Sequence, residues 1–379
     1  MTSDAPLPPD GRDVGSFSTP HPKVSYVIPV LNDADALRPA IDAVLRQDYD
    51  GEQEVVIAVA PSHDGSREIA DERARVDSRV VVVDNPDVHI PAGMNRAVAV
   101  ATGEVVVRVD AHSELPEGYT RRMVDVLATT GAVNVGGVMH AQGRSPVQSS
   151  VARAYNSGLG LGGGSYHSGV ETGPGESAYL GVFRRSFVDR LGWYDTTIRR
   201  GEDYELNQRI LGAGGVIWFV PDVRVTYWPR ESWASLVRQM YATGVWRGEL
   251  VRRRTPMSYR YAAAPLLVLG LASSLAVGVA QLAGAPAVPW AVVHLAPAAY
   301  AAFLGYAAAT LGGHGLVERA RDAGIIATIH LTWGAGFLRG VALGAGDTVD
   351  RSRVIDGEEL PPPPAGRRSA APRRRRRAG

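Results

Sequence analysis

Short runs of β-branched residues alternate with helical patterns from residue 24 to about residue 223. Such runs predict buried strands, and apolar residues at three- and four-residue spacing predict helices. Strands are predicted over Val24–Val30, Glu54–Ala60, Val80–Asp84 and Glu104–Asp110, and helices over Leu37–Arg46, Ser66–Arg75 and Ala92–Ala101. This alternation implies right-handed crossovers and an α/β domain whose mostly parallel sheet is covered on both faces. The Gly-rich stretch Gly158–Gly175 is predicted to be a mobile loop.

The pattern changes after Arg260, where long apolar segments begin. Ala262–Leu282 contains no charge, and neither does Val288–Leu311, whose apolar run is interrupted at His294 and Pro297. Each is long enough to cross a hydrocarbon core of about 30 Å as a helix. A third stretch, Ala323–Leu338, is shorter and ends at Arg339; its neighbourhood contains Gly334, Gly336, Gly340 and Gly344, which would allow close helix packing. The alternative, a soluble bundle of three core helices, is disfavoured by such long uncharged runs.

Basic residues flank the first two apolar segments and predict their orientation. Arg252–Arg254 precede the first segment, and Arg319 and Arg321 follow the second. Positive residues favour the cytoplasmic side, so a hairpin of two spans satisfies both clusters. A third span would place the Arg-rich tail outside, and we therefore expect the third stretch to be a re-entrant or interfacial helix. The expected location is the inner cell membrane, with a multi-pass chain and the α/β domain on the cytoplasmic side.

Composition narrows the possible partners. Lys and Arg number 40 against 39 Asp and Glu, so no overall charge points to nucleic acid. Cysteine is absent, which excludes disulfides, thiolate metal sites and a cysteine nucleophile. Residues 1–22 are polar and Pro-rich, and we expect them to be disordered rather than a signal peptide. The tail, residues 347–379, is expected to be disordered too, with its arginines attracted to anionic lipids by about 1 kcal/mol each.

Two carboxylate-bearing strings carry the candidate chemistry. Asp110 and His112 end a Val-rich strand one residue apart, and ligands of α/β sheets gather at the carboxyl ends of strands. Both side chains can turn toward a divalent ion that carries a diphosphate. Glu202 and Asp203 follow a Gly-containing turn and precede a helical pattern. One carboxylate placed to accept a proton is what a displacement at a sugar carbon requires. The strings together suggest an enzyme that handles a nucleotide-linked substrate.

Further segments indicate a resemblance to a known family. The opening Val24–Asn32, the turn Ser62–Ser66 and the two carboxylate strings follow one another in the order found in the family-2 glycosyltransferases. The chain resembles this family, which consists of inverting, Rossmann-like enzymes that use nucleotide-activated sugars. It is most similar to membrane-attached members of the succinoglycan-assembly glucosyltransferase type, which build exopolysaccharide repeat units on lipid carriers. The resemblance covers roughly residues 23–254 and the C-terminal membrane part. Val59 stands where the family often has an Asp that holds the base, so the bound nucleotide is left open.

The resemblance implies roles for individual residues. Asp203 would be the catalytic base, and Asp110 with His112 would hold Mn²⁺ or Mg²⁺. The residues implied to contact donor or acceptor are Pro29, Asn32, Asp64, Asn95, Asp110, Trp193, Glu202, Gln239, Trp246 and Arg247. The last three are similar to a Gln-x-x-Arg-Trp element of processive relatives, but their altered spacing favours addition of one sugar per encounter.

Several of these residues also have a plainer explanation. Asp64 fits an Asp-Gly turn with a helix cap, and Asn95 fits an ordinary helix. Asp110 could cap a turn, and Glu202 with Asp203 suits the first turn of any helix. Trp193 could equally stack on a sugar ring or be half-buried, and the helix carrying Trp246 could be an amphipathic element at the membrane.

The predicted organisation is therefore a disordered segment over residues 1–22, a glycosyltransferase domain over 23–254, a membrane region of two or three helices over 255–346, and a tail over 347–379. The predicted activity is transfer from a nucleotide-sugar donor to a lipid-linked saccharide acceptor, with no nucleic-acid partner. One alternative is a non-catalytic nucleotide-binding partner of a polysaccharide assembly complex. Another is a metal-dependent hydrolase, which would need more His and Asp ligands than the region around Asp110 offers.

Overall fold

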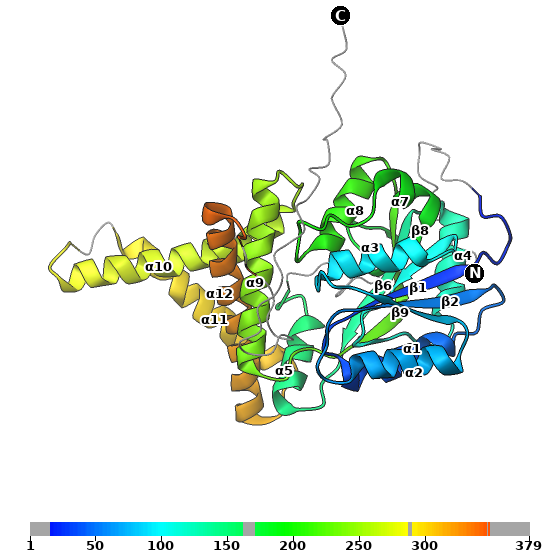
Figure 1. Cartoon of the computed structure of the whole chain (residues 1–379). Coiled ribbons are helices and arrows are strands. Elements are labelled where there is room, and N and C mark those ends of the chain that lie inside the picture. The colour runs from blue at the N-terminus through cyan, green and yellow to red at the C-terminus, as the bar shows by residue number, and fades with distance from the viewer. Residues whose placement is uncertain (1–15, 162–170, 287–289, 347, 349–379) are drawn as a thin grey trace, which may run out of the picture.

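A computed structural model describes residues 16–161, 171–286, 290–346 and 348. In this part of the chain a nine-stranded sheet forms the centre, with helices on both faces (Figure 1). The strands are β1 (Val24–Val30), β2 (Gln53–Val59), β3 (Val80–Asp84), β4 (Val105–Arg108), β5 (Ser113–Glu114), β6 (Asn134–Ala141), β7 (Gly173–Pro174), β8 (Tyr179–Arg184) and β9 (Ile217–Tyr227). Their order is β3-β2-β1-β4-β8-β6-β9-β5, and β7 pairs with β9.

The first four strands form the parallel half of the sheet that the sequence predicts. Val24 of β1 pairs with Gln53 of β2 and with Val105 of β4. Helices α1 (Ala34–Leu45) and α2 (Ser66–Val76) bury their apolar residues in one core, and α3 (Ile90–Val100) does so in another. Parallel neighbours require crossover connections, and these helices supply them. The predicted α/β class is confirmed.

The second half of the sheet mixes strand directions. β8 runs antiparallel to both β4 and β6, whereas β6 and β9 are parallel. Helix α4 (Tyr119–Thr130) packs on the same face as α1 and α2, and α7 (Arg185–Leu191) and α8 (Glu202–Gly212) pack with α3. Helix α5 (Pro146–Tyr155) lies beyond the sheet, where it contacts the C-terminal helices. The sheet is thus mostly parallel but mixed: β8 runs antiparallel in its middle, and the short strands β5 and β7 run antiparallel to β9.

The C-terminal part consists of α9 (Trp233–Arg252), α10 (Ala263–Leu282), α11 (Leu295–Thr310) and α12 (Gly315–Leu343). The last three, with short 3₁₀ turns before α10 and α11, are long and apolar enough to cross a membrane. Within the apolar window of each helix, 11% of the residues of the α10 segment and 6% of those of the α11 segment are buried inside the protein. For α12 the buried share is 33%. α12 is therefore the one of the three that packs most closely against the rest of the protein.

The predicted third apolar stretch, Ala323–Leu338, lies inside α12, a continuous helix of 29 residues. The helix runs through these residues without a break. α12 runs alongside α9, while α10 projects away from this pair (Figure 1). An ion pair fixes α12 to the domain. Arg153 of α5 binds both carboxylate oxygens of Asp322 of α12, which is fully buried, with N–O distances of 2.7 and 2.9 Å. α12 is also long and apolar enough to cross a membrane, so a re-entrant or interfacial placement of this stretch stays a prediction.

Glycines on both helices permit the close contact between α9 and α12. A Cβ atom added to Gly340 would lie 2.1 Å from the carbonyl oxygen of Val245, and one added to Gly244 would lie 2.1 Å from that of Trp333. Gly336 and Gly248 meet the facing backbone in the same way. Small residues four apart on each helix thus bring the two backbones together.

We expect Gly340→Ala to destabilise the protein by about 1–3 kcal/mol, because the added methyl group must push α9 and α12 apart. Gly305→Ala on α11 is the matched control, since its Cβ would meet open space. Removing a helical glycine there should be neutral or slightly stabilising. Thermal unfolding of the detergent-solubilised protein compares the two variants, and equal melting temperatures would contradict this packing.

Three predictions of disorder or mobility have different outcomes. Within the segment expected to be disordered, residues 16–22 pack against the domain: Phe17 lies under the Arg184 guanidinium at 4.0 Å, and Ser18 bonds to Glu104. The apolar ring of Phe17 supplies the contact that composition alone did not indicate. In the expected loop 158–175, residues 162–170 lie outside the described residues, but Gly173–Pro174 forms β7. Residues 1–15 and 349–379 also lie outside the described residues.

Candidate active site

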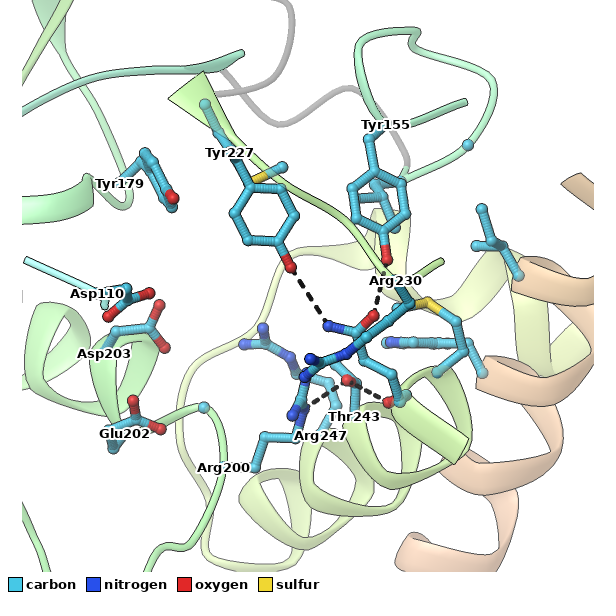
Figure 2. Close-up of a pocket in the computed structure, with 18 of the residues that line it drawn as sticks. Asp110, Tyr155, Tyr179, Arg200, Glu202, Asp203, Tyr227, Arg230, Thr243 and Arg247 are labelled. Atoms are coloured by element: carbon cyan, nitrogen blue, oxygen red, sulfur yellow. Dashed lines mark hydrogen bonds between the residues drawn. The ribbon is translucent and has the colours of Figure 1, made fainter. Parts of the chain in front are cut away.

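A cavity of about 760 Å³ lies where the carboxyl ends of several strands meet α9–α12. Pro29 at the end of β1 and Asp110 just after β4 line its sheet side, and Asp203 at the start of α8 lines the same space. Gln239 and Arg247 enter from α9. Segments far apart in the sequence therefore build one site, at the sheet edge where α/β proteins bind ligands (Figure 2).

A buried arginine links the two carboxylate strings. Arg108, the last residue of β4, donates from Nε to Asp110 Oδ1 at 3.0 Å and from Nη1 to Glu202 Oε1 at 2.9 Å. Arg108 and Glu202 are buried. Burial by itself would raise the pKa of Asp110, but Arg108 and His112 outweigh burial and hold this pKa below its usual value. Burial raises the pKa of Glu202, and the attraction of Arg108 offsets only part of that effect.

Asp203 is oriented differently from its neighbour Glu202. α8 begins after Gly201, whose φ of +79° is a left-handed conformation that glycine adopts without strain. Glu202 then turns into the buried cluster, whereas Asp203 is exposed and lines the cavity together with Asp110. Figure 2 shows the three carboxylates gathered on one side of the cavity. Asp203 is therefore the carboxylate of the pair that a substrate can reach.

The predicted cation ligands lie together but are few. Among the described residues, no three His, Asp or Glu side chains gather as a metal site. Asp110 and His112 both line the cavity, and only Oδ1 of Asp110 bonds to Arg108, which leaves Oδ2 as a ligand. The His112 ring stands edge-on to Tyr227, with 5.3 Å between centroids. Two protein ligands suit a cation that takes its remaining ligands from a diphosphate.

A polar network faces the carboxylates across the cavity. Gln239 accepts a hydrogen bond from the Tyr155 hydroxyl at 3.2 Å and donates to that of Tyr227 at 3.4 Å. Thr243 donates to the Gln239 carbonyl and accepts from Arg200 Nε at 2.6 Å. These bonds, dashed in Figure 2, hold Gln239, Thr243 and Arg200 in place and leave both tyrosine rings as cavity walls.

Arg247 lies next to this network and is held by aromatic rings. Its guanidinium lies over the rings of Tyr204 and Tyr261, 4.1 and 4.9 Å from their centroids. Cation–π contacts hold the group in place without using its N–H donors. Nη1 of Arg247 is buried and has no hydrogen-bond partner among the described residues. A donor held in this way is suited to a ligand with acceptor oxygens.

Several residues that the sequence analysis assigned to substrate binding lie outside the cavity lining. Asn32 accepts from the His63 backbone N–H at 2.9 Å and so joins the turns after β1 and β2. Asn95 bonds to both the N–H and the carbonyl of Tyr194, which fixes the 192–195 turn to α3. Their side chains are used to hold loops, because each reaches backbone groups that no strand or helix satisfies.

Two tryptophans have packing contacts instead of cavity positions. Trp193 packs against Phe183 at 5.7 Å and donates to Asp189, and it does not line the cavity. Trp246 is buried in a separate apolar cluster and donates to the carbonyl of Thr348. Thr243 and Arg247 line the cavity from α9, whereas Trp246 projects to one side of them and packs in that apolar cluster.

Asp64 caps two helices instead of lining the cavity. Its carboxylate accepts from the Ala34 N–H at 2.8 Å and from the Ser66 N–H at 3.0 Å, at the starts of α1 and α2. Partial burial would raise its pKa, but these hydrogen bonds together lower it. We expect Asp64→Ala to cost about 1 kcal/mol of stability and to leave the KM for the donor unchanged.

Because folding lowers the pKa of Asp64, its contribution to stability is present above its ordinary pKa of 3.8 and is lost as the pH falls. Melting temperatures measured from pH 7 to pH 3 should therefore converge for Asp64→Ala and the parent protein. Asp50→Ala, which removes a surface pair with Arg121, serves as control. A raised donor KM with unchanged melting would instead make Asp64 a binding residue.

Other cavity residues were not assigned from the sequence. Arg108 could have been predicted to have a role, because a charged residue within a buried Val-rich strand is rarely without a partner. Arg200, Arg230, Tyr155 and Tyr227 also line the cavity. These four come from the ends of different elements, and no local pattern distinguishes them from ordinary surface or core residues.

Comparisons with known proteins agree with this architecture. Residues 25–192 match the family model of Glycosyl transferase family 2. The chain is 32% identical to the succinoglycan biosynthesis protein ExoA of Rhizobium meliloti over 316 residues, which cover 83% of this chain and 93% of that protein. It is 24% identical to the glycosyltransferase AglE of Haloferax volcanii over 225 residues, 59% of this chain and 72% of the relative. The chain belongs to glycosyltransferase family 2.

A solved structure shares the fold. The mannosyltransferase PcManGT of Pyrobaculum calidifontis, solved with GDP-Man and Mn²⁺, aligns over 85% of this chain and 90% of its own, with a TM-score of 0.54 and 21% sequence identity. The likeness extends over most of both chains, as expected for members of one fold class.

Proposed function

We propose that this protein transfers a sugar, with inversion, from a nucleotide-sugar donor to a lipid-linked saccharide acceptor in exopolysaccharide synthesis. The observation that carries this proposal is a single cavity that contains Asp110 and Asp203 and continues to the apolar helices α10–α12. A water-soluble donor and a membrane-bound acceptor both have access to such a site. The similarity to a succinoglycan biosynthesis protein supports the polysaccharide class.

The donor lies against the sheet edge in this proposal. Pro29, Asp33 and Asn85 line the cavity beside the ends of β1 and β3, where the nucleoside fits. Asp110 and His112 hold Mn²⁺ or Mg²⁺, which when bound neutralises charge on the departing diphosphate. The solved mannosyltransferase contains Mn²⁺ and a sugar nucleotide, which supports this cofactor class. Val59 is buried and offers no polar side chain to the base, so backbone groups, with Asp33 and Asn85 nearby, are left to recognise it.

Asp203 accepts the proton of the acceptor hydroxyl. Glu202 is engaged by Arg108, and Asp110 is held by the same guanidinium, so neither carboxylate is placed to attack the sugar. One base without a carboxylate nucleophile gives a single displacement and inverts the anomeric carbon. Tyr155 and Tyr227 form walls against which the acceptor sugar can pack. Enclosure by α9 and the sheet limits access of water to the reacting carbon.

In this proposal each part of the chain has a place relative to the membrane. Residues 23–254 form the catalytic domain on the cytoplasmic side, and 255–346 attach it to the inner membrane. α10 and α11 cross as a hairpin, with exposed apolar residues such as Leu275 (71%) and Leu282 (90%) toward lipid. Arg252–Arg254 and Arg319 stand at its cytoplasmic ends, as the distribution of positive charge requires. α12 lies along the membrane surface beside α9. The anchor raises the effective concentration of a lipid-bound acceptor.

A donor screen tests the proposal. Full-length protein in detergent is incubated with Mn²⁺, labelled sugar nucleotides and lipid extract from membranes. We expect one donor to transfer its label to the organic phase, and chelation of the metal to stop the transfer. Label released as free sugar regardless of lipid would indicate a hydrolase. Metal-dependent nucleotide binding without any consumption of donor would indicate a non-catalytic binding partner.

A further inference from the structure

The cavity has an apolar end that a sugar nucleotide does not need. Beyond the carboxylates it is lined by Leu267 of α10, Phe303 of α11, and Ile329 and Trp333 of α12. These side chains come from the helices whose outer faces are apolar and exposed. An apolar chain placed here would therefore continue from the catalytic domain to the region in contact with lipid.

Arginines lie between this apolar end and the carboxylates. Arg200, Arg230 and Arg247 line the cavity, and Figure 2 shows them grouped across from Asp110 and Asp203. Arg200 is oriented by its hydrogen bond to Thr243. Arg247 is held over two tyrosine rings, and its buried Nη1 has no hydrogen-bond partner in the described part of the chain. No described carboxylate forms an ion pair with Arg247, so its positive charge is not neutralised within the protein.

We infer that these three arginines and the apolar end form the site for the diphosphate and first isoprene units of a polyprenyl-linked acceptor. Guanidinium groups offer paired N–H donors that match phosphate oxygens, and three of them complement a multiply charged anion. The tail runs along Leu267, Phe303 and Trp333 toward the membrane. This inference rests on the proposed function and deepens it, since it separates the acceptor diphosphate from the donor diphosphate near Asp110.

The position of the arginines has a consequence for the reaction. A lipid held by its diphosphate between Arg247 and the α10–α12 helices presents its attached saccharide toward Asp203. The saccharide hydroxyl then approaches Asp203 from the side of the arginines, across the cavity from the carboxylates.

Binding of short probes tests this site. The full-length protein in detergent is titrated with farnesyl diphosphate, inorganic diphosphate and farnesol. We expect farnesyl diphosphate to bind more tightly than either of the other two, because only it uses both ends of the site. Arg247→Ala should weaken farnesyl diphosphate and inorganic diphosphate by about tenfold or more. Leu267→Gln should weaken farnesyl diphosphate and leave inorganic diphosphate unchanged.

Two matched controls come from the same helices. Arg238→Ala on α9 removes an exposed arginine outside the cavity, and Leu275→Gln on α10 changes an exposed leucine. Neither should alter binding of any probe. Thermal unfolding of every variant, together with binding of a nucleoside diphosphate and Mn²⁺, verifies that the fold and the donor side are intact.

Competition distinguishes this inference from its alternatives. If a nucleoside diphosphate with Mn²⁺ displaces farnesyl diphosphate one for one, the arginines belong to the donor site and the inference is overturned. Equal affinity for farnesyl diphosphate and inorganic diphosphate, or no effect of Arg247→Ala, would also overturn it. These outcomes leave sugar transfer in the donor screen untouched, so the inference can fail while the proposed function stands.

Discussion

Asp203→Asn should lower the rate of sugar transfer by a factor of about 10²–10⁴, the range contributed by a positioned general base. The amide keeps the size of the side chain but cannot accept the proton of the attacking hydroxyl. Asp203 is exposed to the cavity, whereas its neighbour Glu202 is buried, so the substitution removes the one carboxylate of the pair that faces the acceptor. Initial rates with saturating donor and acceptor measure the effect.

The control is Glu205→Gln, on the same helix but outside the cavity lining, where the carboxylate pairs with Arg209. Its rate should stay close to that of the parent protein. Calorimetry should find that a nucleoside diphosphate with Mn²⁺ still binds to Asp203→Asn. Retained turnover in this variant would remove Asp203 as the base, and lost nucleotide binding would move it to the donor side of the cavity.

Arg108→Met should produce the largest loss of stability, about 3–5 kcal/mol, because it leaves two buried or partly buried carboxylates without their cation. The hydrogen bonds of 3.0 and 2.9 Å to Asp110 and Glu202 are both lost. Transfer should fall as well, since Arg108 positions both strings. The melting temperature in detergent measures the stability change.

A double variant provides the control for this prediction. Adding Glu202→Gln to Arg108→Met replaces one uncompensated carboxylate with a neutral amide and should recover part of the lost melting temperature. Arg79→Met, which removes an arginine paired with Asp77 at the surface, should have little effect. Unchanged melting of Arg108→Met would mean that the buried triad does not hold the two strings together.

The parallel half of the fold could be predicted from the sequence because its signals are local. β1 and β3 begin and end at the predicted residues, and β2 and β4 differ only at their ends. Buried parallel strands appear as uninterrupted β-branched runs, and β1, β2 and β3 are each followed by a helix. The second half lacks such signals. β8 lies between β4 and β6 although it follows β7 in the chain, and this pairing depends on contacts between distant segments.

The site residues also fall into those that local sequence signals predict and those that they do not. Asp110 and Asp203 stand at the ends of recognisable elements, and the structure brings both to one cavity. Asn32, Asp64 and Asn95 were expected at the donor, but their side chains satisfy backbone groups of neighbouring turns. A polar residue in a turn can bond to nearby backbone groups or contact a ligand, and the local sequence does not distinguish the two roles. The arginines beyond the carboxylates depend on how α9 meets the sheet, which no local pattern encodes.

The anomeric configuration of the product tests most directly whether Asp110 and Asp203 serve one displacement in one cavity. Proton NMR of the transferred sugar, compared with the donor identified in the screen, gives this configuration. A product with the opposite configuration to the donor is the predicted result, because Asp203 activates a hydroxyl that attacks from the face away from the diphosphate. A product with the donor's own configuration would require a second nucleophile and would contradict the account.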